Sequence, residues 1–347
     1  MSAGWQKSLS ENLVPFAELA EKFDLDSYPL QAVIARYPFR LTRHYYNLIR
    51  QVNDPLWRQV VPDQRELLDE AQLPDPLNEA ALSPVPGLIH RYPDRVVWLV
   101  SNECAVYCRF CMRKRTVGCG VGSCRKPRQT DVLAYIRANP SIRDVILSGG
   151  DPLLLDDEEL ETILASLQQI PHVEMIRIGT RVPVTFPERI TPALAALLKR
   201  YQPLYINTHF NHPREINPAS AAACAVLADA GIPLGNQTVL LKGVNDAPPV
   251  MQALNRGLLQ LRVKPYYLHQ IDLVKGTSHF RTSVRSGLEI MDSLRGHLSG
   301  MAVPYYVIDL PEGKGKVPLL PGQEISPDGL IRLTTYSGET VEYQDIE

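Results

Sequence analysis

The amino-acid sequence predicts an α/β fold in which parallel strands, each followed by a helix, form a partial barrel. From residue 95 onward, short β-branched or apolar runs alternate with segments of helical periodicity, an order typical of parallel βα units. The helical segments also carry the end signals that helices prefer. Polar residues gather directly after the predicted strands, at the edge where βα barrels carry their active sites. These polar positions are 148–151, Arg181, 208–212, Gln237 and 269–272.

The region before the barrel is predicted to be helical and irregular. Segments 15–23 (PFAELAEKF) and 44–52 (HYYNLIRQV) have the apolar spacing of helices, and Pro- and Asp-rich stretches such as 73–87 interrupt the region. We therefore predict three parts along the chain. They are an N-terminal helical region over 1–90, the barrel over 91–310 and a short C-terminal segment over 311–347.

Six segments are the predicted strands, and the predicted helices lie between them. In the helix predicted over 156–170, every third or fourth residue from Leu160 to Leu167 is apolar, and acidic residues occupy the first turn. The segment 217–231 has Pro near its start and Gly at its end, which is typical of a helix. The predicted strands are 95–101, 144–149, 175–180, 204–210, 237–241 and 264–270.

Composition narrows the class of protein. The 347 residues carry a formal net charge of −2, which indicates neither a nucleic-acid nor a membrane partner. The longest apolar runs are too short to cross a membrane, and the first residues lack a signal-peptide pattern, so we expect a cytoplasmic protein. The 6 cysteines do not indicate a disulfide scaffold in a chain of this length. Clustered cysteines in a reducing compartment more often bind metal or take part in chemistry.

Three cysteines, Cys104, Cys108 and Cys111, follow the first predicted strand with the spacing C-x3-C-x2-C. Three interpretations are open. The thiols are unliganded, or they form a structural zinc site that Cys119 or Cys124 completes, since zinc takes four ligands. Alternatively, they hold an iron–sulfur cluster, whose irons are normally all bound by cysteine. A missing fourth cysteine then indicates that a substrate or cofactor binds the remaining iron.

This motif after the first strand of a βα barrel resembles the signature of the radical S-adenosylmethionine enzymes. The segment SGGDPLLL after the second strand resembles the glycine-rich segment of that family, in which the backbone comes close to the cofactor. The resemblance implies a partial (β/α)6-type barrel, a [4Fe-4S] cluster on the three cysteines and S-adenosyl-L-methionine on the open iron. It implies cofactor contacts from Ser148, Gly149, Gly150, Asp151, His209, Asn211 and Gln237.

Further segments are similar to the lysine 2,3-aminomutase branch of this family. They include THFNHP at 208–213, GNQTVLLKGVND at 235–246 and KPYYLHQIDL at 264–273. The similarity runs from about residue 80 to about residue 322. It implies an isomerase that moves the α-amino group of L-lysine to C3. It also implies pyridoxal 5'-phosphate as a second cofactor and an electron donor such as flavodoxin or ferredoxin, and it allows a homo-oligomer.

The resemblance assigns the second cofactor to residues near both ends of the barrel. In the segment 310–321 (LPEGKGKVPLLP), Lys316 matches the lysine that bonds pyridoxal phosphate, whereas Lys314 stands where the family usually has glycine. Arg91 and Arg95 match the residues that bind the phosphate, and Tyr92 lies near the ring. Arginine suits this role because its fork of donors is always charged. The alternatives without a cofactor are that the segment 310–321 is a mobile surface loop and that Arg91 and Arg95 are solvated arginines.

The resemblance also assigns the substrate contacts. Arg113 matches the residue that binds the α-carboxylate, and Asp272 and Asp309 match the paired acids that receive the ε-ammonium of lysine. Two carboxylates against one cation in a dry pocket select strongly, because an anionic substrate leaves buried charge unpaired. The acid pair therefore favours lysine, or a similar cationic amino acid, over glutamate.

Some positions depart from the branch. His269 stands where the lysine enzymes carry Tyr, Ala247 stands where a zinc-binding Cys is expected, and the Cys-rich tail of the clostridial type is missing. We therefore predict no structural zinc. Cys119 and Cys124 are additional cysteines in a Gly-rich loop; they shield the site from solvent, form an accessory metal site or have no role, and we favour the last. Two rivals inside the family are a supplier of β-lysine to elongation factor P and a mutase for arginine or another amino acid. The rival outside it is a zinc-ribbon binding protein that uses the three clustered cysteines and Cys119.

Overall fold

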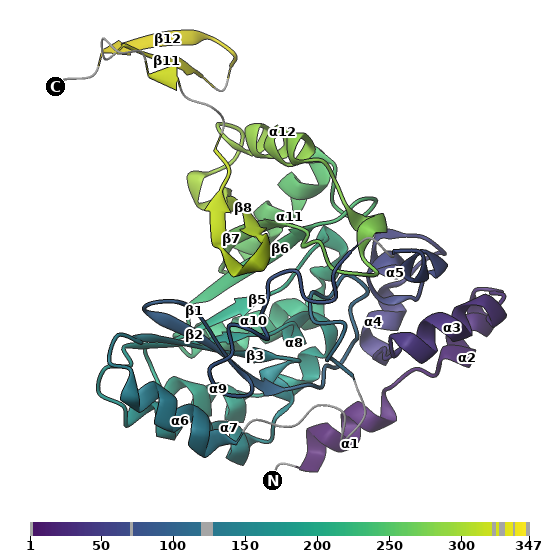
Figure 1. Ribbon diagram of the computed structural model, residues 1–347. Coiled ribbons are helices and arrows are strands. Elements are labelled where there is room, and N and C mark those ends of the chain that lie inside the picture. Colours follow the sequence, from purple (N-terminus) through teal and green to yellow (C-terminus); the bar gives the residue numbers. More distant parts are fainter. Residues whose placement is uncertain are drawn as a thin grey trace.

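The computed structural model describes residues 3–69, 72–118, 128–320, 324–325, 330–335 and 337–344. Its centre is a 9-stranded sheet in the order β1-β2-β3-β4-β5-β6-β7-β8-β9 (Figure 1). Strands β2 to β8 run parallel, whereas β1 pairs antiparallel with β2 and β9 pairs antiparallel with β8. Because β1 and β9 end the sheet without pairing with each other, the barrel stays open. The predicted partial barrel is confirmed.

The sheet contains all six predicted strands and continues beyond them. Strands β1, β8 and β9 were not predicted, and in the case of the short β9 a Gly- and Lys-rich segment surrounds the strand and hides its pattern. The strands are β1 (Leu88–Tyr92), β2 (Arg95–Ser101), β3 (Asp144–Gly149), β4 (Met175–Gly179), β5 (Leu204–Thr208), β6 (Leu234–Leu240), β7 (Val263–Gln270), β8 (Tyr305–Leu310) and β9 (Gly315–Pro318).

The helices that follow the strands cover the outside of the sheet (Figure 1). In α7 the predicted apolar face, from Leu160 to Leu167, is buried. Asn217 caps α10 by accepting hydrogen bonds from the N–H groups of Ala219 and Ser220. These helices are α6 (Gln129–Ala138), α7 (Asp157–Gln168), α8 (Val182–Thr185), α9 (Pro192–Lys199), α10 (Pro218–Asp229), α11 (Pro248–Gln260) and α12 (Val284–Leu294).

The N-terminal region is helical, as predicted, and it shares the hydrophobic core of the barrel. Buried residues of α4 and α5, such as Tyr45 and Leu56, belong to the same cluster as Val96 and Trp98 of β2. The limits of the three predicted parts remain a prediction, although β9 lies in the main sheet. The N-terminal helices are α1 (Ala3–Glu11), α2 (Phe16–Lys22), α3 (Tyr28–Arg36), α4 (Arg43–Leu48) and α5 (Pro55–Val60).

A second, small sheet follows the barrel. It has the order β10-β11-β12, with antiparallel pairing, and projects away from the barrel (Figure 1). Its strands are β10 (Glu324–Ile325), β11 (Leu330–Thr334) and β12 (Thr340–Gln344). Cys119 and Cys124 lie outside the described residues. In the part of the chain that the structure describes, no helix has the length and apolar character needed to cross a membrane.

Candidate active site

The open barrel encloses a cavity of about 540 Å³, a size typical of sites for small molecules and cofactors. Residues of the main sheet and of the loops that follow its strands form the walls. Every site residue predicted from the sequence lines this cavity except Asn211. The lining set is Arg91, Tyr92, Arg95, Cys104, Cys108, Cys111, Arg113, Ser148, Gly149, Gly150, Asp151, His209, Gln237, Asp272, Asp309 and Lys316.

The three clustered cysteines lie on the loop that follows β2. Burial raises the pKa of Cys104 well above its ordinary value, and Asp151 and the other two thiols add to the rise. Burial and the neighbouring Cys108 raise the pKa of Cys111 to about 11. Cys104 and Cys111 therefore stay protonated until a metal ion or cluster binds them, and thiolate is the form that binds metal.

Gly149 and Gly150 let the end of β3 approach the cysteine loop. Gly149 has a φ of +116°, and a Cβ there would lie 2.2 Å from the carbonyl oxygen of Ser101. A Cβ on Gly150 would lie 2.4 Å from the carbonyl oxygen of Glu103. The N–H of Gly150 instead donates to Ser101 at 2.6 Å, and that of Asp151 donates to Glu103 at 2.7 Å. The glycine-rich segment therefore anchors the loop that carries the cysteines.

The Asp151 carboxylate is engaged by the protein itself. Its Oδ1 accepts hydrogen bonds from the Thr180 hydroxyl at 2.7 Å and from the N–H of Leu153, and its Oδ2 accepts from the N–H of Arg181 at 2.7 Å. Burial raises the pKa of Asp151, and these hydrogen bonds offset part of the rise. The contacts join the ends of β3 and β4, a structural role that the motif alone did not indicate.

Arg113 lines the cavity, and Glu79 orients it from the segment before β1. The Arg113 Nη2 lies 2.7 Å from Oε1 of Glu79, while Nε lies 3.1 and 3.2 Å from the two carboxylate oxygens. The third nitrogen, Nη1, donates to the Ser148 hydroxyl at 3.3 Å. Glu79 is only 4% exposed. It was not predicted, because a single Glu in a Pro-rich stretch carries no sequence signal.

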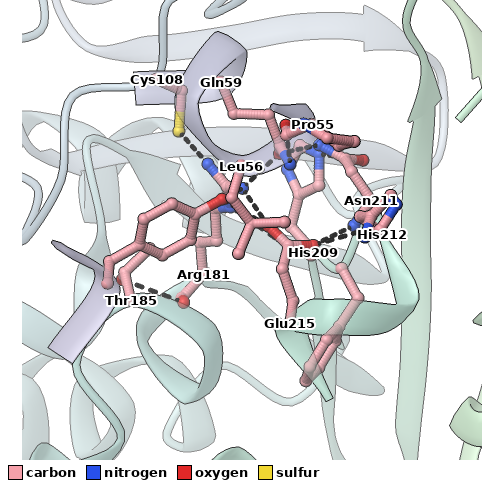
Figure 2. A network of polar contacts seen from close by, with 12 residues as sticks. Pro55, Leu56, Gln59, Cys108, Arg181, Thr185, His209, Asn211, His212 and Glu215 are labelled. Atoms are coloured by element: carbon pink, nitrogen blue, oxygen red, sulfur yellow. Dashed lines mark hydrogen bonds and ion pairs between the residues drawn. The ribbon is translucent and has the colours of Figure 1, made fainter. Parts of the chain in front are cut away.

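Arg181, predicted only as a polar residue after a strand, contacts a cysteine of the loop (Figure 2). It precedes α8, and its Nη1 lies 2.7 Å from Sγ of Cys108. Its Nη2 lies 2.6 Å from Oε1 of Gln59 and 2.7 Å from Oε1 of Glu215, on the two sides of a buried network. Burial lowers the pKa of Arg181, but Cys108, Tyr45 and Glu215 outweigh it and hold the pKa above its ordinary value. The guanidinium is therefore a permanent cation beside the cysteines.

His209 and Asn211 follow β5 and lie at different depths. His209 lines the cavity, and burial and the Arg181 cation keep its pKa well below the ordinary value, so the imidazole is neutral. Asn211 is fully buried; its Oδ1 lies 3.1 Å from Nε2 of His209, and its Nδ2 donates to Gln59 at 3.0 Å. Asn211 thus supports His209 from behind. Gln237 lines the cavity from β6.

The β8–β9 hairpin brings Asp309 and Lys316 together. The two residues are partners in the antiparallel register, and Nζ of Lys316 lies 2.7 and 2.8 Å from the carboxylate oxygens of Asp309. Lys314, in contrast, has a side chain that is 67% exposed and pairs with the equally exposed Glu312 at 3.0 Å. The hairpin therefore directs Lys316 into the cavity and Lys314 to solvent.

The arginines predicted to bind phosphate already have partners. Arg91 donates from Nη1 to Oδ1 of Asp309 at 3.0 Å, although the two residues were predicted to contact different ligands. The Arg95 guanidinium lies 4.9 Å from the centre of the Tyr92 ring and bonds to the half-exposed Asp94. The Tyr92 hydroxyl accepts the N–H of Lys316 at 2.7 Å. Strands β1, β2 and β9 thus form one end of the cavity.

The two predicted acids differ in their surroundings. Asp272 lines the cavity with no hydrogen bond or ion pair from its side chain to another described residue. Burial and the negative charge of Asp309 raise the pKa of Asp272 to about 7. Burial also acts to raise the pKa of Asp309, but His269 and Lys316 outweigh it and hold that pKa well below its usual range. Asp309 is therefore neutralised by the protein, whereas the Asp272 side chain has no ion-pair partner among the described residues, although the more distant charges of Lys316 and Arg91 offset part of the rise in its pKa.

Two family models match the chain. The radical SAM superfamily model matches residues 98–251, and the lysine-2,3-aminomutase model matches residues 291–345. The L-lysine 2,3-aminomutase of Fusobacterium nucleatum is 45% identical over 351 residues, which cover 99% of this chain and 82% of that protein. The chain belongs to the lysine 2,3-aminomutase family of radical SAM enzymes.

Other relatives of this aminomutase carry two substrate names. The L-lysine 2,3-aminomutase of Clostridium subterminale is 50% identical over 309 residues, 88% of this chain and 74% of that protein. The glutamate 2,3-aminomutase of Clostridioides difficile is 46% identical over 319 residues, 91% of this chain and 76% of that protein. The overall sequence identity therefore does not distinguish lysine from glutamate as the substrate. The side chains that line the cavity have to distinguish them.

Family membership implies a [4Fe-4S] cluster, S-adenosylmethionine and pyridoxal phosphate, and the cavity of this aminomutase fits them. The raised pKa values of Cys104 and Cys111 mean that these two thiols become ligands only when a cationic metal group binds them. Lys316 reaches the cavity beside Arg91, Tyr92 and Arg95. Within the described residues, no set of three His, Cys, Asp or Glu side chains is grouped to hold one metal ion. A cluster takes one thiolate on each iron, so its cysteines need not converge on a single point.

Proposed function

We propose that the chain is a radical S-adenosylmethionine aminomutase that moves the α-amino group of L-lysine to C3 and so produces β-lysine. The observation that carries this proposal is the set of residues that line one cavity. The cysteine loop, the lysine of the β8–β9 hairpin, the oriented Arg113 and the unpaired Asp272 all line it. A substrate bound in this cavity of about 540 Å³ is therefore next to every group that the reaction requires.

The residues divide the work of binding. Cys104, Cys108 and Cys111 hold the cluster, Lys316 bonds pyridoxal phosphate, and Arg95 with Arg91 binds its phosphate. When bound, the cofactors supply a radical that removes hydrogen from the substrate and a π-system through which nitrogen migrates. The protein supplies position and electrostatics.

Arg113 binds the substrate α-carboxylate in this proposal. Glu79 holds one edge of its guanidinium, so the orientation of Arg113 is set before substrate arrives. The Nη1 atom that donates to Ser148 is turned away from Glu79 and is the donor left for a ligand. The permanent positive charge of the guanidinium also attracts the carboxylate.

Asp272 supports lysine as the substrate rather than glutamate. A buried carboxylate with a raised pKa gains most from a cationic partner, and the ε-ammonium of lysine is such a partner. The side-chain carboxylate of glutamate, placed near Asp272 and Asp309, is repelled instead. Arginine is also cationic, although its side chain is longer than that of lysine. It is therefore the competing substrate for a site with these carboxylates.

The remaining partners are also proposals. A low-potential donor such as flavodoxin or ferredoxin delivers the electron that the cluster needs. We propose a cytoplasmic location, because a reducing compartment keeps Cys104, Cys108 and Cys111 as free ligands. We also propose a homo-oligomer, as the resemblance allows.

An anaerobic assay of the reconstituted enzyme tests the function. Chain with dithionite and all three cofactors is incubated with L-lysine, L-glutamate or L-arginine, and β-amino acids are quantified. We expect β-lysine as the product, with kcat/KM for glutamate lower by at least about 100-fold. Faster turnover of glutamate or arginine contradicts the substrate assignment. About four irons per chain are expected. Bound zinc without iron contradicts the proposal that the chain is a radical S-adenosylmethionine enzyme.

A further assay separates a free product from a protein-bound one. Lysine, elongation factor P and its attaching enzyme are supplied together. β-Lysine found mainly attached to the factor indicates the translation-factor role, whereas β-lysine that accumulates mainly as the free amino acid supports the proposed reaction.

A further inference from the structure

Arg181 is a buried cation in direct contact with a cysteine of the cluster loop. Its side chain is 8% exposed, and Nη1 lies 2.7 Å from Sγ of Cys108. Arginine has no neutral form under ordinary conditions, so this contact brings a fixed positive charge to the sulfur. Arg181 is distinct from Arg113, which contacts Glu79 and Ser148.

A buried network keeps the Arg181 guanidinium in place (Figure 2). Glu215 accepts from Nη2 of Arg181 at 2.7 Å and also from the N–H groups of Asn211 and His212 at 2.6 and 2.9 Å. Gln59 of α5 accepts from the same Nη2 at 2.6 Å. Because both acceptors are themselves fixed by the backbone or by neighbouring side chains, the guanidinium has one available orientation.

A fixed cation beside a ligand sulfur acts on the reduction of a cluster. One-electron reduction by the low-potential donor adds one negative charge to the cluster and its thiolates. Hydrogen bonds to the sulfurs and nearby positive charge stabilise that extra charge and make the reduction potential less negative. Electrostatic effects of this kind are strong in a dry interior.

We propose that Arg181 sets the reduction potential of the cluster by donating to Cys108, with Glu215 and Gln59 as the residues that position it. The inference rests on the proposed cluster ligation by Cys108. Arg181 raises the potential, and the negative charge of Glu215, the carboxylate that accepts from the guanidinium, partly offsets the effect. The N-terminal helices thereby contribute to the redox site through Gln59.

The chain offers a matched control in Arg189. It is also a fully buried arginine, and it donates to the carbonyl oxygens of Leu153 and Leu155 and to Asp157. Among the described residues, the hydrogen-bond partners of its side chain include no cysteine. Loss of its guanidinium tests the effect of removing a buried arginine from the same part of the barrel.

The test measures the midpoint potential of the reconstituted full chain by an EPR-monitored redox titration, together with iron content. We expect Arg181→Gln to shift the potential to a more negative value and Glu215→Gln to shift it to a more positive value. Arg181→Lys, which keeps a cation, is expected between wild type and Arg181→Gln, and Arg189→Gln is expected at the wild-type potential.

Two outcomes overturn the proposal. One is a wild-type potential in Arg181→Gln protein that carries its full iron. The other applies if Arg181→Gln does not assemble a cluster: an unchanged or more negative potential in Glu215→Gln then overturns it. Failure of the proposed function is seen in the wild-type chain instead. Wild-type chain without iron has no cluster to which Arg181 contributes. Wild-type chain without aminomutase activity has no reaction to which Arg181 contributes.

Discussion

At the scale of single residues, burial decides the charge that each side chain brings to the cavity. Asp272 and Asp309 are chemically identical, yet the pKa of Asp272 is raised to about 7 and that of Asp309 is lowered. The difference arises because Lys316 and His269 lie beside Asp309, whereas Asp272 has no cationic partner within hydrogen-bonding reach among the described residues. Asp272 is therefore the carboxylate whose charge a substrate ammonium can restore.

The raised pKa of Asp272 predicts pH-dependent binding of lysine. Below pH 7 the carboxyl is mainly neutral, and above it the carboxylate is available for the ammonium, whose own pKa is far higher. We expect KM for lysine to fall about 10-fold between pH 6 and pH 8, as the ionised fraction rises. The measurement is steady-state kinetics across this range, with Asp272→Asn as the control. A pH profile that Asp272→Asn leaves unchanged assigns the dependence to another group.

Lys316 and Lys314 form a natural pair of test sites, two residues apart. We expect Lys316→Ala to remove the absorbance of covalently bound pyridoxal phosphate and to abolish turnover, because its Nζ is the amine that the hairpin directs into the cavity. Lys314→Ala, at an exposed ion pair, is expected to keep both. Absorbance spectra of the two variants with intact clusters provide the comparison, and the reverse pattern assigns the cofactor to Lys314.

At the scale of elements, two short connections shape the site. The β8–β9 hairpin places Asp309 opposite Lys316, and the end of β3 clamps the cysteine loop through Gly149 and Gly150. Both connections depend on glycine, since Gly315 has a φ of +99° and Gly149 has a φ of +116°. Local backbone geometry therefore determines which functional groups face the cavity.

The contact between the end of β3 and the cysteine loop is sensitive to any side chain at Gly150. A Cβ there meets backbone atoms of Glu103 at 2.4 and 2.6 Å, which cannot rotate away. We expect Gly150→Ala to lower the free energy of unfolding by about 1–3 kcal/mol and to reduce the iron bound on reconstitution. The control is Gly300→Ala, where no atom lies within 4 Å of the new Cβ. Thermal unfolding and iron analysis of both variants test the expectation, which equal behaviour of the two contradicts.

At the scale of the whole molecule, the N-terminal region is joined to the barrel by apolar packing and by buried charge. Glu66 accepts from Nη2 of Arg109 at 2.5 Å and from Nζ of Lys114 at 2.7 Å, and all three side chains are nearly inaccessible. Burial acts to raise the pKa of Glu66, but Arg109 and Lys114 outweigh it and lower that pKa. Arg109 lies within the cysteine loop, between Cys108 and Cys111, and Lys114 follows it, so the N-terminal region supports the cluster end of the cavity.

Glu66 is accordingly expected to be important for stability. Glu66→Gln leaves Arg109 and Lys114 as buried cations without their anion, and we expect a loss of about 3–5 kcal/mol in the free energy of unfolding near pH 7. Because the pKa of Glu66 is lowered on folding, this difference should shrink as the pH falls below about 4. Glu11→Gln removes the exposed pair with Lys7 and is expected to change stability by less than about 0.5 kcal/mol. Denaturant unfolding at several pH values provides the measurement, and equal losses in the two variants contradict the prediction.

The sequence by itself determined the architecture and the chemical identity of the site. Strands, helix faces and the C-x3-C-x2-C motif are local patterns, so they are visible within a few residues of the chain. The assignments of Lys316 and Arg113 came from the resemblance of short segments to the aminomutase branch, and both side chains line the cavity.

Only the tertiary structure decided which partners each functional side chain has. Glu79 lies 34 positions from Arg113, and Gln59 lies 122 positions from Arg181, so no local pattern connects them. The ion pair between Arg91 and Asp309 spans 218 positions. The physical reason is that charge state and orientation depend on burial and on neighbours that the fold brings together, and a linear pattern contains neither.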